Sequence, residues 1–388
     1  MRGGASVAVL PSRRVATSSP VLVADSASLG ALLERVEDVL GEAVALDTEA
    51  DSFHHYFEKV CLVQLGLGED VFLADPLAPV DLAPLFARLA KRRLLMHGAD
   101  YDLRLLWRAY GFRASAIFDT MIAAQLVGEK EIGLAALLAA RVGVALDKAH
   151  QRADWSERPL PAGRIAYAAA DVLHLPALVA SLARDLEAKG RLAWHAEECA
   201  RLAAAPFPLE RASDPENDWR IKGTNALSDK ERAFAKTLWE ARDARARALD
   251  RPSFRVLTNE KLLEAAKRAA AGERDLSKLF SGQRLPDAAA RSFKEALAAA
   301  AALAPSAWPI ARRGARVEPD PSIEREVEAL KKARDAKAEA LGLDPGVVAS
   351  RASLAAAARV KRARGGLTAD ALVAEAGFSR WRAGILAG

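Results

Sequence analysis

The sequence predicts a domain of the α/β or α+β class followed by two small all-helical units. Short β-rich runs recur between residues 44 and 96, and helical patterns are interleaved with them. This mixture indicates a sheet covered by helices. After Asp119 the apolar residues take helical spacing, and one ten-residue pattern occurs twice in the C-terminal half, which predicts two copies of a helical unit.

The composition argues against several classes of protein. A chain of 388 residues exceeds a typical domain of roughly 100 to 200 residues, so two or three domains are expected. A hydrophobic share of 51% with 28% charged residues is typical of a soluble globular protein, and we expect no membrane span. Cys61 and Cys199 lie far apart with no His or Cys at metal-ligand spacing, which disfavours disulfides and zinc and fits a reducing cytoplasm.

The charge leaves two interpretations open. The net charge is +5, and residues 301–388 contain fifteen Lys and Arg against ten Asp and Glu, so this segment alone carries a surplus of the same size. An anionic partner is one explanation, and a solvated basic helix surface is the other.

The expected elements follow in order along the chain. Residues 1–20 are Arg- and Ser-containing without acids and are expected to form a disordered extension. The β-rich runs predict strands at 44–47, 60–65, 71–73 and 94–96, with helices at 82–90 and 101–110. The stretch from Pro161 to Lys189 reads as one long helix or two, with Pro176 as the kink and Gly190 as the stop.

Two breaks in composition delimit the helical units. The segments 203–218 and 304–320 lose periodicity and gain Pro, as linkers do. The pattern at 240–249 returns at 332–341, each copy followed by a Pro and a Leu at similar offsets. The predicted domains are therefore an extension at 1–20, a sheet domain at 21–205, and helical domains at 213–300 and 318–388.

Two acidic residues end the first expected strand. Alternate residues of a strand point to one face, so Asp47 and Glu49 project together from the end of an apolar run. Adjacent carboxylates repel each other and lose hydration unless a cation lies between them. A metal site is one explanation, and acids on a strand end that enters solvent are the other.

A third acid follows the apolar run 94–96. The run breaks at Gly98 and turns into a helix, whose first turn contains Asp102 at a position where the helix dipole favours an acid. Asp102 is either a capping acid or a metal ligand, whereas Asp100 lies nearer the helix start and suits the capping role. His97 is expected to be a strand-end residue.

A fourth acid lies in a helical stretch. Tyr167 and Asp171 are spaced i, i+4 and therefore share one helix face, which the three intervening alanines leave unobstructed. A phenol one turn from a carboxylate can hydrogen-bond a water held by a metal on that carboxylate. The alternative is a buried Tyr with a polar neighbour.

Taken together, these motifs resemble the ribonuclease D family. Asp-x-Glu, then His-Gly-x-x-x-Asp about fifty residues on, then Tyr-x-x-x-Asp about seventy further, is similar to the three exonuclease motifs of the DEDD superfamily, Tyr subclass. The resemblance continues through 118–124, 133–137 and 154–160, and the repeats resemble helicase-and-RNase-D C-terminal (HRDC) domains. It implies a ribonuclease H-like α/β exonuclease domain, with a mixed sheet flanked by helices, followed by two small all-α HRDC domains.

Two departures from the family pattern are expected to leave the chemistry unchanged. Pro161 stands where a Ser or Thr cap is usual, and Arg164 where Gln is common, but Pro is tolerated at a first helical position. Asp119 is expected to be structural and to cap the helix that begins at Thr120.

The resemblance also implies roles for individual residues. Asp47, Glu49 and Asp171 would hold one divalent cation, and Asp47 with Asp102 a second, while Tyr167 would orient the attacking water. Ligands that are all oxygen suit Mg²⁺ or Mn²⁺, and two such cations suit phosphodiester hydrolysis. The residues expected to contact nucleic acid are Lys148, Arg152, Trp155 and His97.

The expected activity is 3′-to-5′ exoribonuclease action on structured RNA such as tRNA precursors, by a cytoplasmic monomer. A DNA exonuclease is an alternative, because the carboxylates would read phosphate geometry and not the sugar. A non-catalytic RNA-binding scaffold is another, but a scaffold would ordinarily have lost at least one of the five motif residues.

Overall fold

The computed structural model describes residues 19–38, 43–147, 149–207, 214, 216–281, 287–311 and 320–388. These residues form two compact units. The first comprises residues 1–50, 60–209 and 317–388, and the second comprises 51–59 and 210–316. Most of the extension expected at 1–20 lies outside the described residues.

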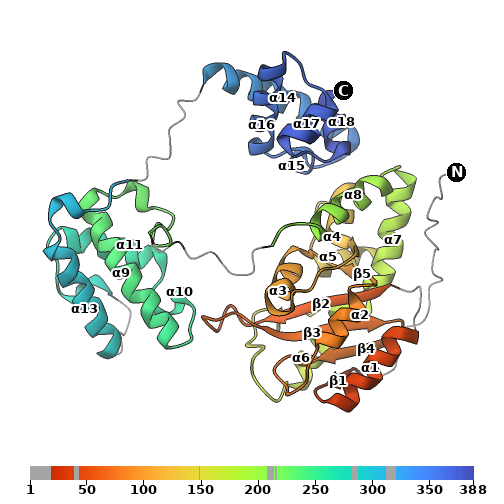
Figure 1. Ribbon diagram of the computed structural model, residues 1–388, viewed down its shortest axis with the longest axis horizontal. Helices are drawn as coiled ribbons and strands as arrows, with labels where there is room; N and C mark the ends of the chain where they lie inside the picture. The colour runs from red at the N-terminus through yellow and green to blue at the C-terminus, as the bar shows by residue number, and fades with distance from the viewer. Residues whose placement is uncertain are drawn as a thin grey trace. The chain divides into compact units, whose positions relative to one another are not determined.

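A six-stranded mixed sheet forms the centre of the first unit (Figure 1). Its spatial order is β1-β4-β3-β2-β5-β6. The pairs β1·β4, β2·β5 and β5·β6 are parallel, whereas β3 pairs antiparallel with both β2 and β4. The strands are β1 (Val21–Val23), β2 (Val44–Ala50), β3 (Val60–Leu67), β4 (Asp70–Ala74), β5 (Arg93–Met96) and β6 (Ala116–Asp119).

Helices cover both faces of this sheet, as expected for the mixed fold. On one face α1, α2 and α3 pack against a core that includes Leu46 and Leu65. On the other face α4 to α8 pack against a core that includes Ala45 and Leu62. The helices are α1 (Ser26–Asp38), α2 (Ala83–Leu89), α3 (Asp100–Tyr110), α4 (Thr120–Val127), α5 (Leu134–Arg141), α6 (Ala162–Leu173), α7 (Leu175–Ala188) and α8 (Leu192–Ala203).

The expected break in the long helical stretch lies at His174, between α6 and α7, with Pro176 in the first turn of α7. Gly190 follows α7 at a φ of +66°, a conformation that favours glycine. By length and composition alone, Ala162–Ala188 could cross a membrane, with a mean hydropathy of 1.6, which the sequence reading had not expected. It packs on the sheet, as a core helix does.

The second unit has a helical core of its own. Its helices are α9 (Asp229–Ala248), α10 (Ser253–Val256), α11 (Asn259–Ala270), α12 (Leu276–Leu279) and α13 (Asp287–Ala302). The loop 51–59, which joins β2 to β3, belongs to this unit, where His55 Nδ1 lies 2.7 Å from a carboxylate oxygen of Asp250.

The C-terminal helices repeat this arrangement, as the sequence repeat predicts. They are α14 (Pro321–Leu341), α15 (Pro345–Val348), α16 (Arg351–Arg364), α17 (Ala369–Ala376) and α18 (Arg380–Ala387). In α9 the buried Arg242 donates to the Leu257 carbonyl at 3.0 Å, and in α14 the equivalent Arg334 donates to the Ala349 carbonyl at 2.5 Å. In each copy, a buried arginine thus donates to the carbonyl fifteen residues further along the chain.

The C-terminal helical domain also shares the core of the first unit. The Trp381 ring stacks on Trp194 of α8, with centroids 4.7 Å apart, and its Nε1 donates to Glu198 at 2.7 Å. Arg191 donates to the carbonyls of Leu126 and Leu341 at 2.6 Å each. These contacts bury apolar surface that the sheet domain would otherwise expose.

Candidate active site

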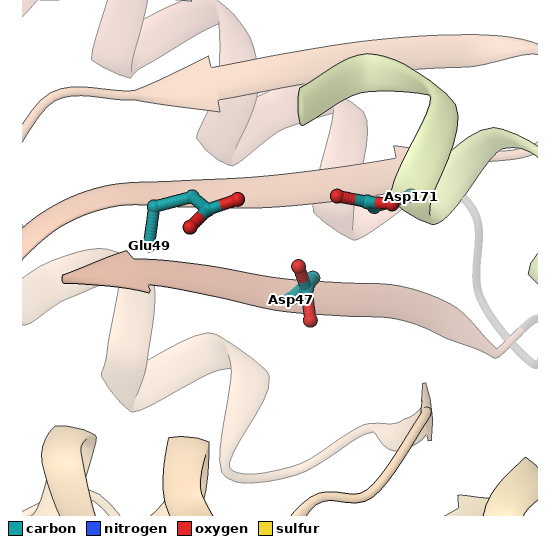
Figure 2. Close-up of side chains that lie close together, drawn as sticks. All are labelled: Asp47, Glu49 and Asp171. Atoms are coloured by element: carbon teal, nitrogen blue, oxygen red, sulfur yellow. The ribbon is translucent and has the colours of Figure 1, made fainter. Parts of the chain in front are cut away.

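Strand β2 carries two carboxylates on the face that α6 covers. Asp47 and Glu49 alternate with Leu46 and Thr48, so the acids share the face of Ala45. Figure 2 shows the side chains of Asp47 and Glu49 close to that of Asp171, which comes from a neighbouring helix. Oxygen atoms of the three acids lie within 4.8 Å of one another.

A glycine allows α6 to approach the sheet this closely. A Cβ at Gly66 of β3 would lie 3.1 Å from Ala45 Cβ and 3.3 Å from the Val172 carbonyl oxygen. Such distances are tighter than ordinary contacts, so a larger residue would push α6 away. Because Asp171 directly precedes Val172, this close approach sets how far its carboxylate lies from β2.

Asp102 lies beside this group on α3. Its side chain is 6% exposed and accepts a hydrogen bond from the hydroxyl of Thr48, whose side chain alternates with those of Asp47 and Glu49. The charge of Asp47 affects Asp102, so the two acids are electrostatic neighbours. The structure therefore brings Asp47, Glu49 and Asp171 together and holds Asp102 next to them.

The start of α3 is fixed by another acid, Asp119. Its buried carboxylate accepts from the backbone N–H groups of Gly98 at 3.0 Å and Ala99 at 2.8 Å. It also accepts from Met121 N at 2.8 Å, which caps α4. The structural role predicted for Asp119 is confirmed, and it extends to the turn that positions Asp102.

The four acids are poorly accommodated by the protein alone. Burial away from water, and to a smaller extent the charge of Asp171, raises the pKa of Asp47 to about 8. Loss of solvent and the charge of Asp47 raise the pKa of Glu49 to about 10, and loss of solvent raises that of Asp171 to about 7. Within the described part of the chain, no ion pair to Lys, Arg or His is formed by any of the four.

This donor set fits divalent cations. The ligand atoms are carboxylate oxygens from three different elements, and hard cations such as Mg²⁺ prefer oxygen. Bound cations would offset both the loss of hydration, which is the main cause of the raised pKa values, and the repulsion between the acids. The fold therefore presents a carboxylate cluster that divalent metal ions can occupy.

Tyr167 lies one turn before Asp171, on the same side of α6. Loss of solvent and the charge of Asp171 raise the pKa of its phenol, so the hydroxyl stays protonated at neutral pH. Its ring packs against Trp155, with centroids 5.9 Å apart and planes inclined by 43°. Arg164 holds the loop that carries Trp155, donating to the Asp154 carbonyl at 2.6 Å.

Comparisons with known proteins agree with this architecture. A family model described as 3′-5′ exonuclease matches residues 20–187, and one described as HRDC domain matches residues 231–286. Ribonuclease D of Gluconacetobacter diazotrophicus is 34% identical over 301 residues, covering 76% of this chain and 75% of that protein. The chain belongs to the ribonuclease D family. The ribonuclease D relatives and the 3′-5′ exonuclease domain make it a hydrolase of the exoribonuclease class.

Solved structures extend the likeness over the whole ribonuclease D architecture. A protein from Bifidobacterium adolescentis superposes with a TM-score of 0.76 at 25% identity, covering 95% of each chain. Escherichia coli RNase D, described as an exoribonuclease involved in structured RNA processing, superposes with a TM-score of 0.64 at 27% identity. That match covers 87% of this chain and 89% of the other.

The residues predicted to contact nucleic acid have different surroundings. Arg152 is exposed in this ribonuclease D family member, and Lys148 lies outside the described residues. Trp155 is 1% exposed and its ring packs against that of Tyr167, so its contact with nucleic acid stays a prediction. His97 is half-buried, with Nδ1 2.9 Å from the Thr120 hydroxyl.

Two smaller expectations also need correction. Asp100 was expected to cap α3, but its side chain forms no cap and instead pairs with Arg104 at 2.8 Å. Pro161 was expected at a first helical position and occupies the N-cap, with α6 beginning at Ala162.

The sequence reading missed two residues of the site. Thr48 orients Asp102, and its signal was its place between the two acids of Asp-x-Glu. Gln64 is a polar residue in the apolar run of β3, and it pairs in register with Asp47.

Proposed function

We propose that this ribonuclease D family member hydrolyses RNA one nucleotide at a time from the 3′ end, using two divalent cations, Mg²⁺ or Mn²⁺, and releasing nucleoside 5′-monophosphates. The observation that carries the proposal is the group of three carboxylates with oxygens within 4.8 Å, with Asp102 beside it. Such a group is costly unless cations bind it, and paired cations suit phosphodiester hydrolysis.

Each acidic side chain and Tyr167 has its own role in the proposed reaction. When bound, the cations supply a nucleophilic water at neutral pH and stabilise charge on the leaving oxygen. Asp47, Glu49 and Asp171 would hold the first cation, and Asp47 with Asp102 would hold the second. Tyr167 keeps its proton because its pKa is raised, so its hydroxyl orients the attacking water and does not act as the base.

The substrate is proposed from the relatives and from the charge of the chain. Escherichia coli RNase D is described as acting in structured RNA processing, and the HRDC match places a helical domain after the exonuclease domain. The basic surplus of residues 301–388 favours a polyanion. We therefore propose tRNA precursors with a 3′ extension as the substrate class. Cytoplasmic localisation and a monomeric state stay predictions.

The proposal is tested by incubating the protein with a 3′-extended tRNA, and separately with the DNA of the same sequence, in Mg²⁺ or in EDTA. We expect stepwise shortening of the RNA, 5′-mononucleotide products and complete inhibition by EDTA. Preferred degradation of the DNA would identify a DNA exonuclease. Binding of RNA without products in Mg²⁺ would identify a scaffold.

A further inference from the structure

One buried side chain near the carboxylates has unsatisfied hydrogen-bonding capacity. Gln64 of β3 is 0% exposed, and neither its Nε2 nor its Oε1 has a hydrogen-bond partner among the described residues. Among those residues, it is the side chain in which two buried polar atoms both lack a partner. Burying an amide without partners is unfavourable, so its presence in an apolar run calls for a ligand-dependent explanation.

The register of the sheet places this amide beside the metal ligands. Gln64 is directly opposite Asp47 across the antiparallel β2·β3 pair, and directly opposite residues project to the same face with Cβ atoms about 4.5–5.5 Å apart. On the same face of β3, Leu62 lies opposite Glu49, and Gly66 lies under the backbone of α6. The Gln64 amide thus has Asp47 at its side and α6 above it.

Binding of a cation by Asp47 would give the Gln64 amide a hydrogen-bond acceptor. A glutamine offers two N–H donors, and an ionised carboxylate that binds a cation through one oxygen keeps further lone pairs for such donors. Groups that hydrogen-bond a metal ligand fix its orientation and strengthen metal binding. In the described part of the chain, the Asp47 carboxylate interacts with the backbone N–H of Thr48 and accepts no hydrogen bond from a side chain.

We infer that Gln64 is a positioning residue of the metal centre, whose amide N–H donates to the Asp47 carboxylate when cations are bound. This inference rests on the proposed metal-dependent function. It predicts an unusual pair of effects, because the same amide is unfavourable in the metal-free protein and favourable in the metal-bound one. An ordinary packing residue would lower stability in both states.

The test uses the full-length chain with Gln64→Met, which keeps side-chain length and removes both polar atoms. Leu62→Met is the matched control, since Leu62 is buried on the same strand and face and carries no polar group. Each variant is melted in EDTA and titrated with Mn²⁺ alone by calorimetry. Gln64→Leu repeats the test with a different apolar shape, so that a packing defect specific to Met is recognised.

We expect the Gln64 variants to melt in EDTA at or above the wild-type temperature and to bind Mn²⁺ about tenfold more weakly, in the range of other residues that orient metal ligands. Wild-type Mn²⁺ affinity in both variants would overturn the inference. A melting temperature lowered by several degrees in both would also overturn it, because it would assign Gln64 to packing. A wild-type protein that binds Mn²⁺ but degrades no RNA would contradict the proposed function and leave this inference standing.

Discussion

Replacing Asp47 with asparagine should stabilise the metal-free protein while nearly abolishing its activity. The oxygens of these carboxylates lie within 4.8 Å of one another, and two unit charges at that limit repel each other by about 3.5 kcal/mol at an effective dielectric constant of about 20. Asp47 has two such neighbours, Glu49 and Asp171. At pH 9 Glu49 stays mostly protonated because its pKa is raised to about 10, whereas Asp47 and Asp171 are mostly ionised and repel each other. We therefore expect Asp47→Asn to raise the stability of the metal-free protein by about 1–2 kcal/mol at pH 9, or roughly 2–8 °C in EDTA.

The same substitution removes a carboxylate shared by both proposed cations. If the transition state loses about 4 kcal/mol of stabilisation, the rate falls about a thousandfold, since each ~1.36 kcal/mol is a factor of ten. The assays are thermal melting in EDTA at pH 9 and hydrolysis of a short RNA in Mg²⁺. Near-normal activity, or a melting temperature below that of the wild type, would refute the reasoning.

Asp100→Asn is the matched control for this experiment. Asp100 is also an acid of this domain, but it is exposed and paired with Arg104 at an i, i+4 spacing. Exposed pairs of this kind contribute about 0–1 kcal/mol. Activity and melting temperature should therefore stay close to those of the wild type.

Three further predictions follow from the site and its support. Tyr167→Phe should leave the melting temperature nearly unchanged and lower turnover by less than Asp47→Asn does, whereas equal rates for Phe and Tyr would make the residue a core aromatic only. The folded pKa values of Asp47 and Asp171 lie above their unfolded value of 3.8, so the metal-free fold binds more protons than the unfolded chain. Its stability should therefore fall as pH rises from about 4 to about 8, and the stabilisation by Mg²⁺ should grow over the same range. A difference between the melting temperatures in Mg²⁺ and EDTA that does not depend on pH would contradict this. Trp381→Ala should destabilise the sheet domain by about 3 kcal/mol in urea unfolding, since the ring is 6% exposed and stacks on Trp194; unchanged unfolding would show that the C-terminal helices do not support it.

The local parts of the site could be predicted from the sequence because they depend only on the residue periodicity of a single strand or helix. Two acids at alternate positions share a face of any strand, and Tyr167 and Asp171 share a face of any helix. Asp119 could be assigned to a cap for the same reason, because its partners Met121 and Ile122 follow it directly.

The features that the sequence could not show depend on contacts between distant segments. Trp155 follows two basic residues in a loop, which suggests an RNA contact, but its burial against Tyr167 comes from the packing of that loop on α6. Gln64 lies in an otherwise apolar strand, and only the register of β2 against β3 places it opposite Asp47.

The domain boundaries show the same limit. The composition breaks fall between helices, since α8 ends at Ala203, α13 ends at Ala302 and α14 begins at Pro321. They suggest that the sheet domain is complete before the first linker. In the structure, Ala338, Leu343, Val348 and Trp381 join the core formed by α4 to α8. No local pattern reveals this contact, because an apolar helix face looks the same whether it packs within its own domain or on another.

The metal centre is tested most directly by a crystal structure of the full chain with Mn²⁺, in which anomalous scattering locates each ion. Two peaks about 3.5–4 Å apart, with Asp47 bound to both, Glu49 and Asp171 to one and Asp102 to the other, are the predicted result. Absence of Mn²⁺ from these carboxylates at saturating concentration, or a single ion that Asp47 does not bind, would contradict it.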